Sequence, residues 1–280
     1  MRASASRARH TPAGVHEPPW DALGLLFEVR CSDPELSSHL NRLLAGLPRA
    51  VGTEAAVQFE IDAVVGPEFE SVGKAIETMI SKLNLGAIGA AEGNLLFHAG
   101  AASGPAGEVV VICGPSGSGK STLTARLVES GLAYLTDEVT CIDPFDLRLT
   151  PFRKPLSFKP GSQPLFAHLE TRFDPATVRF TDDVWLIPFT ELGGSSLPTG
   201  PLQPRLLIFP EYSAGARLHV HRLSPGEAAF TLGSNSSRLR DVRGSALPAL
   251  GRLAAQAPAY RILHSDVNAA AEQVRELLAA

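Results

Sequence analysis

The sequence predicts an α/β fold in which a glycine-rich strand-loop-helix unit forms the core and a smaller α/β region precedes it. Strand-like and helix-like segments alternate along the 280 residues, as they do in proteins whose sheets are covered by helices. Gly114 to Ser121 fits the P-loop pattern G-x-x-x-x-G-K-[ST]. The β-branched run "EVVVIC" (Glu108 to Cys113) comes directly before it, and the helical pattern "STLTARLVES" overlaps its end. The pattern therefore lies in the strand-loop-helix context that it requires.

Three regions are predicted along the chain. Residues 1–20 are basic at their start, lack an apolar pattern and are expected to form a disordered tail. Residues 21–90 are expected to form the small N-terminal α/β region, in which Asp33 caps one helix and the apolar positions between Val72 and Leu83 mark another. Residues 91–280 are expected to form the P-loop domain.

Composition argues against several classes of protein. The formal net charge is −4 and the sequence pI is about 6.1, so no nucleic-acid partner is expected. No apolar run approaches the ~20 residues of a membrane span, and no hydrophobic segment follows the N-terminal arginines, so neither a membrane protein nor a secreted one is expected. Cys31, Cys113 and Cys141 are widely spaced and odd in number, as is typical of reduced thiols in a cytoplasmic protein. The oligomeric state stays open, with a homo-oligomer as one alternative.

The P-loop residues predict a binding site for nucleotide phosphates. Small side chains let consecutive backbone N–H groups turn toward one anion, and the N-terminus of the following helix favours negative charge. Lys120 is expected to reach the β- and γ-phosphate oxygens, and the Ser121 hydroxyl to bind Mg²⁺. The cofactors implied are ATP and Mg²⁺, although nothing in the loop distinguishes ATP from GTP. The residues expected to contact the nucleotide are Gly114, Pro115, Ser116, Gly117, Ser118, Gly119, Lys120, Ser121 and Thr122.

Two adjacent acids, Asp137 and Glu138, follow the loop closely. Gly131 is expected to end the helix, and "LAYLT" (Leu132 to Thr136) to form a strand. If that strand is parallel to the P-loop strand in a compact βαβ unit, a right-handed crossover brings both carboxyl ends to one sheet edge, where the acids face the γ-phosphate. One acid would then hold Mg²⁺ while the other accepts a proton from an attacking hydroxyl. The alternative is a solvated acidic turn without a role.

Four further side chains are weaker candidates. The Pro-punctuated segment 151–162 carries Arg153, Lys154 and Lys159, and the scarcity of lysine in the chain marks the two lysines as a local cationic site. Lys159 and Arg153 either clamp a transferring phosphoryl group or are ordinary surface charges. His98 ends the strand-like run "NLLFHAG", ahead of a Gly/Ala-rich turn, and taken alone it is predicted to be structural.

The C-terminal half carries fewer signals of chemistry. "ELGGSSLPTGPLQP" (Glu191 to Pro204) is expected to be a lid, a substrate-binding loop or a flexible connection. "RLLIFPEY" and "ARLHVHRL" are expected to form a strand pair, "SPGE" to cap a short helix, and the last residues to form an amphipathic helix.

The runs "FHAG", "GPSGSGKST", "LTDE" and "KPLSFKPGS", in that order, resemble the HPr kinase/phosphorylase-like kinases. The likeness is strong from Leu95 to Ser162. The N-terminal region is similar to that of HPr-kinase-related proteins from peptide natural-product gene clusters, including kinases that phosphorylate lasso peptides. The family fold resembles the nucleotide-binding core of phosphoenolpyruvate carboxykinase. The resemblance implies that Asp137 is the base toward a serine hydroxyl, that Glu138 helps to hold Mg²⁺, and that His98 lies close to the reacting groups.

The chain departs from HPr kinases proper at two positions of the resemblance. Thr122 stands where they tend to carry an acid, and Glu138 where they tend to carry a second aspartate. No counterpart of their own N-terminal domain or of their C-terminal signature is visible. These departures argue against phosphorolysis of phosphoserine and against HPr as the substrate.

The sequence therefore predicts a kinase that uses ATP and Mg²⁺ to phosphorylate a hydroxyl, in the leading hypothesis a serine, of a small protein or peptide. Two alternatives stay open: a small-molecule kinase of the same fold, and a non-catalytic nucleotide-binding adaptor whose loop 191–204 responds to ATP. The residues expected to take part in catalysis are Asp137, Lys120, His98, Glu138 and Lys159, and those expected to hold the metal are Ser121, Glu138 and Asp137.

Overall fold

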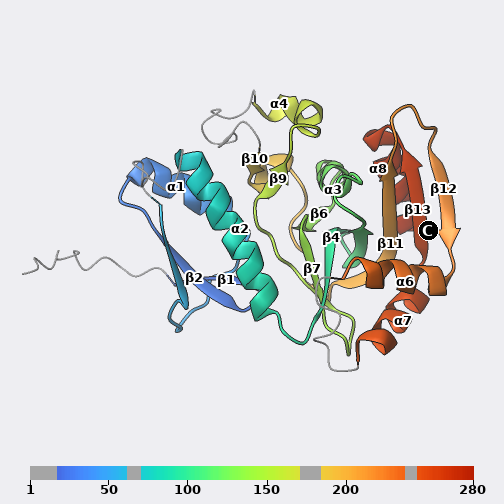
Figure 1. The fold of residues 1–280 in the computed structure, drawn as a ribbon, viewed down its shortest axis with the longest axis horizontal. Coiled ribbons are helices and arrows are strands. Elements are labelled where there is room, and N and C mark those ends of the chain that lie inside the picture. Colours follow the sequence, from blue (N-terminus) through green and yellow to red (C-terminus); the bar gives the residue numbers. More distant parts are fainter. Residues whose placement is uncertain (1–17, 62–70, 171–183, 237–244) are drawn as a thin grey trace, which may run out of the picture.

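The computed structural model describes residues 18–61, 71–170, 184–236 and 245–280. These residues form a mixed α/β protein with a central eight-stranded sheet, a three-stranded sheet in the N-terminal region and a two-stranded sheet (Figure 1). Within the same ranges, no helix is both long enough and apolar enough to cross a membrane.

The N-terminal region consists of β1 (Trp20–Ala22), β2 (Leu25–Arg30), α1 (Pro34–Leu44), β3 (Val57–Glu60) and α2 (Val72–Ala90). In its sheet, β2 pairs antiparallel with β1 and parallel with β3. Both helices share one buried apolar cluster with the sheet. The predicted cap of α1 is confirmed, because the Asp33 carboxylate accepts the Leu36 N–H at 2.8 Å.

Trp20 does not belong to the disordered tail expected over residues 1–20. Residues 1–17 lie outside the described residues, but Trp20 already begins β1 and is only 6% exposed. Its indole stacks on Phe27, and the Arg49 guanidinium lies 3.5 Å from the ring centre. These contacts bury Trp20 in the N-terminal region.

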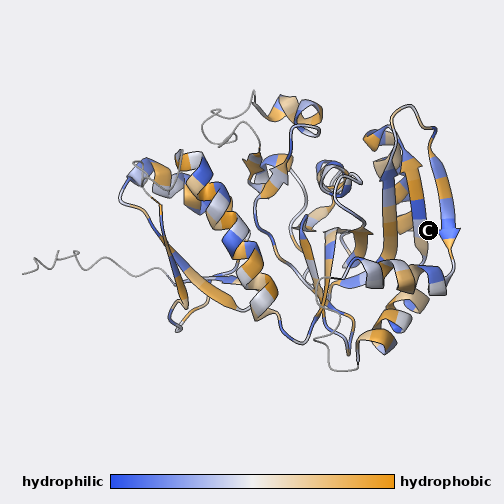
Figure 2. Ribbon diagram, in the orientation of Figure 1, coloured by the Kyte–Doolittle hydropathy of each residue, from blue (hydrophilic) through white to orange (hydrophobic). Residues whose placement is uncertain are grey.

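The central sheet contains β4 (Leu95–Ser103), β5 (Glu108–Cys113), β6 (Ala133–Thr136), β7 (Val139–Ile142), β8 (Leu149–Thr150), β11 (Gln203–Tyr212), β12 (His219–Leu223) and β13 (Ala259–His264). Its order is β12-β13-β11-β5-β4-β7-β8, and β6 also pairs with β4. The neighbours β5, β11 and β13 are parallel, so their carboxyl ends lie at one edge of the sheet. The outer strand β12 is mostly hydrophilic, as exposed edge strands commonly are (Figure 2).

Helices cover both faces of this sheet. They are α3 (Lys120–Glu129) and α8 (Val267–Ala279) on one face and α6 (Pro225–Ser234) and α7 (Ala246–Gln256) on the other. Residues of β5 alternate between the two layers: Val109 and Val111 face α6 and α7, whereas Val110 and Ile112 face α3 and α8. The predicted helices after the P-loop, after "SPGE" and at the C-terminus are confirmed as α3, α6 and α8.

Shorter elements lie between the N-terminal region and α3 (Figure 1). They are β9 (Leu156–Phe158), β10 (Trp185–Ile187), α4 (Ala167–Glu170) and the 3₁₀ helices η1 (Gln163–Phe166) and η2 (Phe189–Leu192). β9 and β10 pair antiparallel, and Leu156, Phe158, Trp185 and Ile187 join the cluster under α3, whereas Leu186 joins the cluster of the N-terminal region.

β6 and β7 lie end to end along the same side of β4. The β4 ladder pairs Ala101 with the end of β6 and His98 with the start of β7. Between these pairs, the Ala99 N–H donates to the Glu138 carbonyl at 3.2 Å. The two strands are thus one antiparallel run that is interrupted at Asp137 and Glu138, much as a β-bulge interrupts a strand.

Three expectations about strands need correction. β5 and β6 do run in the same direction, but β4 lies between them, so they are not neighbours in a compact βαβ unit. The Gly/Ala run after His98 forms no turn and continues β4 to Ser103, because its small residues let α3 lie close: a Cβ on Gly100 would be 2.1 Å from Thr124 Oγ1. The predicted pair β11 and β12 is separated by β13, which pairs with both.

The N-terminal region contacts later parts of the chain closely at Gly46, just after α1. A Cβ at this position would lie 2.1 Å from the Arg153 carbonyl oxygen and 2.9 Å from the Phe189 ring. Because a backbone carbonyl cannot move aside cheaply, we expect Gly46→Ala to lower the free energy of unfolding by about 1–3 kcal/mol in urea denaturation. Gly89→Ala on α2 is the control, since no described atom lies within 4 Å of its added Cβ. Equal losses in the two variants would contradict the close contact.

Candidate functional site

The glycine loop, residues Gly114–Gly119, joins β5 to α3. Gly117 and Gly119 have φ angles of 84° and 94°, in the left-handed region that favours glycine. At Gly114 a Cβ would lie 2.9 Å from Ser118 Oγ, so a side chain there would collide with the loop itself. The loop thus has a physical reason for glycine at three positions, and two of them, Gly114 and Gly119, are the glycines of the predicted pattern.

The loop suits the phosphate groups that its sequence predicts. No side chain caps the N-terminus of α3, so no side chain accepts a hydrogen bond from its first backbone N–H groups. Ser118 Oγ is buried and has no hydrogen-bond partner among the described residues, which is unusual for a buried hydroxyl. Lys120 Nζ reaches back across the loop and donates to the Pro115 carbonyl at 2.9 Å. Helix N–H groups, an unpaired hydroxyl and an ammonium therefore border one loop, which suits an anion.

Charged groups surround Lys120. Burial lowers the pKa of its ammonium; Cys113, Glu138 and Asp137 oppose this shift, and the positive charge of Lys159 adds to it. Both acids and Lys159 are therefore close enough to influence Lys120 electrostatically.

The register of the sheet explains this proximity. The Glu138 carbonyl accepts from Ala99, and Ala99 pairs with Cys113 at the end of β5. The acids and the start of the glycine loop hence lie at the same level of the sheet. Since only β4 separates them, two strand spacings of about 4.8 Å place their backbones roughly 10 Å apart.

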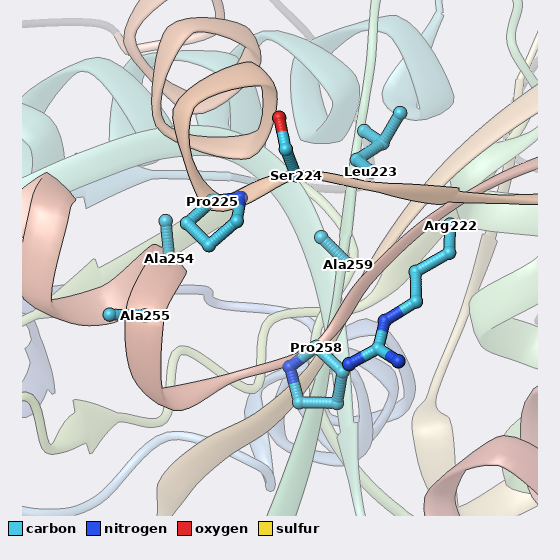
Figure 3. Close-up of a pocket in the computed structure, with 8 residues that line it drawn as sticks. All are labelled: Arg222, Leu223, Ser224, Pro225, Ala254, Ala255, Pro258 and Ala259. Atoms are coloured by element: carbon cyan, nitrogen blue, oxygen red, sulfur yellow. The ribbon is translucent and has the colours of Figure 1, made fainter.

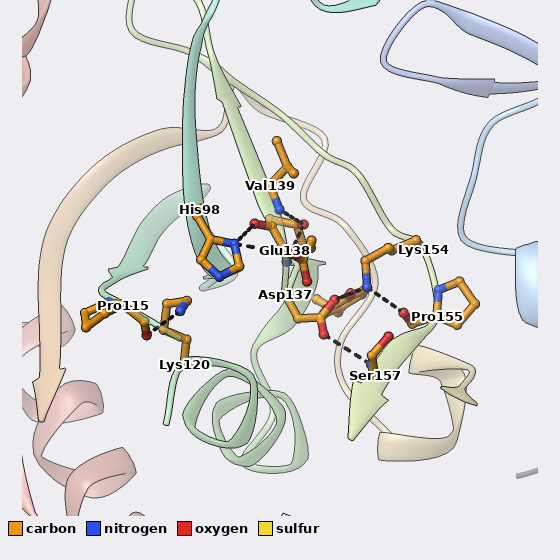
Figure 4. Close-up of polar contacts among 11 residues, drawn as sticks. His98, Pro115, Lys120, Asp137, Glu138, Val139, Lys154, Pro155 and Ser157 are labelled. Atoms are coloured by element: carbon orange, nitrogen blue, oxygen red, sulfur yellow. Dashed lines mark hydrogen bonds and ion pairs between the residues drawn. The ribbon is translucent and has the colours of Figure 1, made fainter. Parts of the chain in front are cut away.

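Asp137 is buried in an ion pair with Lys154 (Figure 4). Its Oδ1 accepts from Lys154 Nζ at 2.7 Å and from the Tyr134 hydroxyl at 2.9 Å, and its Oδ2 accepts from the Ser157 N–H at 3.2 Å. Lys154 also donates to the Pro155 carbonyl at 2.9 Å. Burial, together with the charge and the hydrogen bond of Asp137, raises the pKa of Tyr134 well above its usual value, so the phenol remains a donor. Both carboxylate oxygens of Asp137 are occupied away from solvent.

Glu138 and His98 form a second, more open pair, with side chains 35% and 39% exposed. His98 Nδ1 lies 3.3 Å from Glu138 Oε1 and 3.2 Å from the Glu138 carbonyl oxygen. Both of these atoms are acceptors, so the hydrogen-bond network assigns the proton to Nδ1 and leaves the lone pair of the neutral ring on Nε2.

The Glu138 carboxylate is held in its charged form. Burial alone would raise its pKa, but the hydrogen bond from His98 and the positive charges of Lys154 and Lys120 oppose burial, and the pKa is lowered. Glu138 is therefore an ionised carboxylate close to the glycine loop.

Lys159 and Arg153, for which the sequence predicts the same two alternatives, have different surroundings. Thr122 Oγ1 lies 2.7 Å from Ser162 Oγ, which ties the turn after β9 to the first turn of α3. Lys159 is exposed in that turn, and its carbonyl accepts the Ser162 N–H. Arg153 instead lies 3.8 Å from the centre of the Phe189 ring. Thr122, the residue that departs from the HPr kinase pattern, thus anchors the turn that carries Lys159.

A magnesium ion would have few protein ligands here. Within the described ranges, no three His, Cys, Asp or Glu side chains are grouped so that they could hold a metal. Mg²⁺ usually keeps several waters and binds through one or two carboxylates together with phosphates, so it needs no such group. Ionised Glu138 and the half-buried Ser121 at the start of α3 suit that mode. Asp137 suits it poorly, because both of its oxygens already accept hydrogen bonds.

A surface pocket of about 510 Å³ lies elsewhere in the molecule, near the β12–α6 and α7–β13 connections (Figure 3). Its lining consists of Arg222, Leu223, Ser224, Pro225, Ala254, Ala255, Pro258 and Ala259. None of the predicted site residues lines it. Ser224 and Glu227 form a reciprocal capping box, so the N-terminus of α6 beside this pocket is already satisfied by side chains.

No protein-family model matches the sequence, and a search of curated proteins finds no match either. Among solved structures, the chain is similar to the HPr(Ser) kinase/phosphatase from Coxiella burnetii. The two are 13% identical, the match covers 66% of this chain and 93% of that one, and the TM-score is 0.33. This is a distant likeness of fold. It says nothing about substrate or mechanism.

The Asp137–Lys154 pair makes a prediction about stability. Lys154→Met leaves a buried carboxylate without its counter-charge, so we expect the free energy of unfolding to fall by about 3–5 kcal/mol. The double variant Asp137→Asn/Lys154→Met removes both charges and should recover much of that loss. Urea unfolding of the wild type and both variants measures the difference. A double variant no more stable than Lys154→Met would show that pairing of charge is not the cause.

Proposed function

We propose that this protein is a kinase that uses ATP and Mg²⁺ to phosphorylate a serine hydroxyl of a small protein or peptide. One observation carries the proposal: the glycine loop with Lys120 lies at the same level of the central sheet as the open pair formed by His98 on β4 and Glu138 on the far side of β4. A phosphate-binding loop close to a proton acceptor is what transfer of a phosphoryl group to an alcohol requires.

The glycine loop and Lys120 form the phosphate-binding part. N–H groups at the start of α3 and the Lys120 ammonium would stabilise the negative charge of the transferring group. Bound Mg²⁺ supplies further neutralisation of phosphate charge. Ser121 and Glu138 are the residues suited to hold it, because Glu138 Oε1 faces His98 and leaves Oε2 for the ion. Exposed Lys159, on the turn anchored to Thr122, is the second cation available to the phosphates.

His98 is the proton acceptor in this mechanism. Glu138 holds the Nδ1–H and would stabilise the imidazolium that forms when Nε2 takes the proton of the attacking hydroxyl. In the view of Figure 4 the His98 ring lies between Glu138 and Lys120. The family resemblance gives the base role to Asp137, but a buried carboxylate that already accepts three hydrogen bonds is poorly placed to touch a substrate proton. Asp137 instead positions the backbone that carries Glu138.

The exposure of the reacting pair favours a peptide over a small metabolite as the acceptor. His98 and Glu138 are each more than one-third exposed. A hydroxyl on a flexible chain can approach such a pair from solvent, whereas small ligands are usually enclosed for most of their surface.

The proposed activity is tested by intact-mass measurement. We expect the protein, incubated with ATP, Mg²⁺ and serine-containing peptides encoded beside its gene, to add about 80 daltons to one of them. Lys120→Ala should abolish the gain. A peptide that gains mass equally with wild type and Lys120→Ala, or no gain with any peptide, contradicts the proposal.

The base assignment makes a separate prediction. His98→Asn should lower kcat by about 10²- to 10⁴-fold while ATP affinity stays near that of the wild type, because the imidazole acts on the acceptor proton. His219→Asn, on the exposed edge strand β12, is the matched control and should keep the wild-type rate. If His98→Asn retains full kcat while a folded Asp137→Asn loses it, the base is Asp137 after all.

Asp137, the base that the family resemblance implies, is sequestered in a buried ion pair. This favours a second candidate function, a nucleotide-binding adaptor without catalysis. An adaptor would bind ATP with wild-type affinity in the His98→Asn and Asp137→Asn variants and would transfer phosphate in none. The kinase proposal expects transfer by the wild type and its loss in His98→Asn.

A further inference from the structure

The ends of β11 and β13 border the glycine loop on the side away from β4. β11 runs past the end of β5, since Ile208 pairs with Ile112 while β11 continues to Tyr212. The Pro210 carbonyl would lie 3.8 Å from a Cβ on Gly114. Tyr212 pairs in turn with His264 at the end of β13. Two aromatic side chains therefore end neighbouring strands beside the loop.

His264 is a buried histidine without a hydrogen-bond partner. It is 3% exposed, and among the described residues neither ring nitrogen has a partner at hydrogen-bonding distance and angle. Its Nε2 would lie 3.7 Å from a Cβ on Gly119, the N-cap of α3. Burial lowers the pKa of His264, against the opposing influence of the Asp266 backbone and charge. A neutral imidazole, with one donor and one acceptor, thus lies unpaired against the phosphate end of α3.

Such an arrangement indicates a missing partner. A buried polar group without a hydrogen bond costs free energy, and it is normally explained by a ligand, an ion or water. The nearest predicted ligand is the nucleotide at the N-terminus of α3. His264 is placed to donate to it or to accept from it beside Gly119.

Tyr212 offers a partly exposed ring next to this histidine. It is 55% exposed, and its ring meets that of His264 at 71° with the centroids 5.9 Å apart. This edge-to-face contact steadies the phenol. An exposed aromatic ring beside a phosphate site suits stacking with a nucleobase, because every base has a flat π-face.

We propose that Tyr212 and His264 form the side of the nucleotide site away from β4, with Tyr212 stacked on the base and His264 hydrogen-bonded to the phosphates next to Gly119. This inference rests on the proposed function, which sets the direction of the nucleotide. The transferable phosphate must lie toward His98 and Glu138, on the β4 side of β5. The nucleoside then extends to the opposite side, where β11 and β13 end.

Binding of ATP and of inorganic tripolyphosphate, measured by titration calorimetry, tests the inference. Tripolyphosphate carries the three phosphates without a nucleoside. We expect Tyr212→Ala to weaken ATP binding by about tenfold to a hundredfold and to leave tripolyphosphate binding unchanged, because the lost contact is with the base. Phe230→Ala, which removes an aromatic ring that is 78% exposed on α6, is the control and should change neither affinity.

A second variant tests the histidine. His264→Gln should weaken ATP and tripolyphosphate alike, since it removes a contact beside the phosphates, while the thermal unfolding midpoint reports that the fold is kept. If Tyr212→Ala leaves ATP affinity unchanged, or weakens tripolyphosphate as much as ATP, the nucleoside site is not there. If the wild type binds neither ligand, the proposed function itself fails. The two failures are therefore distinguishable.

Discussion

Backbone hydrogen bonds from β4 reach β5 on one side and the interrupted run of β6 and β7 on the other, and they determine where the candidate site lies. Alternate residues of β4 face opposite layers: Leu95, Phe97 and Ala99 face α6 and α7, whereas His98 and Gly100 point the other way. A slip of one residue would turn His98 into that apolar layer. The hydrophobic residues on both sides of the histidine therefore hold it at the level of the glycine loop.

The interruption between β6 and β7 gives two adjacent acids opposite environments. Asp137 turns inward and contacts β6 through Tyr134, the segment before β9 through Lys154, and β9 through Ser157. Glu138 turns toward solvent and His98. A buried ion pair contributes little net stability compared with apolar packing, and we infer that its value here is geometric, because it fixes the direction of its neighbour. Carboxylates in such different surroundings are suited to different roles.

Local features of the fold could be read from the sequence, and non-local ones could not. The helices carry their own caps and apolar spacing, as at Asp33 and in the capping box at Ser224. The glycine loop is a contiguous pattern between a strand and a helix. The insertion of β4 between β5 and β6 leaves no local trace, since strand order is set by pairing between distant segments. β13 has no clear strand signature in the sequence either, because Arg261 interrupts the apolar run of "AYRILH".

The candidate site shows the same division. Residues of the glycine loop were predicted because they are neighbours in sequence. The partner of Asp137 is 17 residues away, and Lys154 had no feature that distinguished a buried ion pair from a surface cation. His264 and Tyr212 belong to no motif, and only parallel pairing of β13 with β11 brings them to the loop.

The N-terminal region is also joined to the site by packing. Its buried cluster includes Leu96 on β4 and Val139 on β7, which flank the His98–Glu138 pair. Because those residues complete the apolar core of that region, it forms part of the support for the reacting pair, and the geometry of the site depends on both parts of the chain.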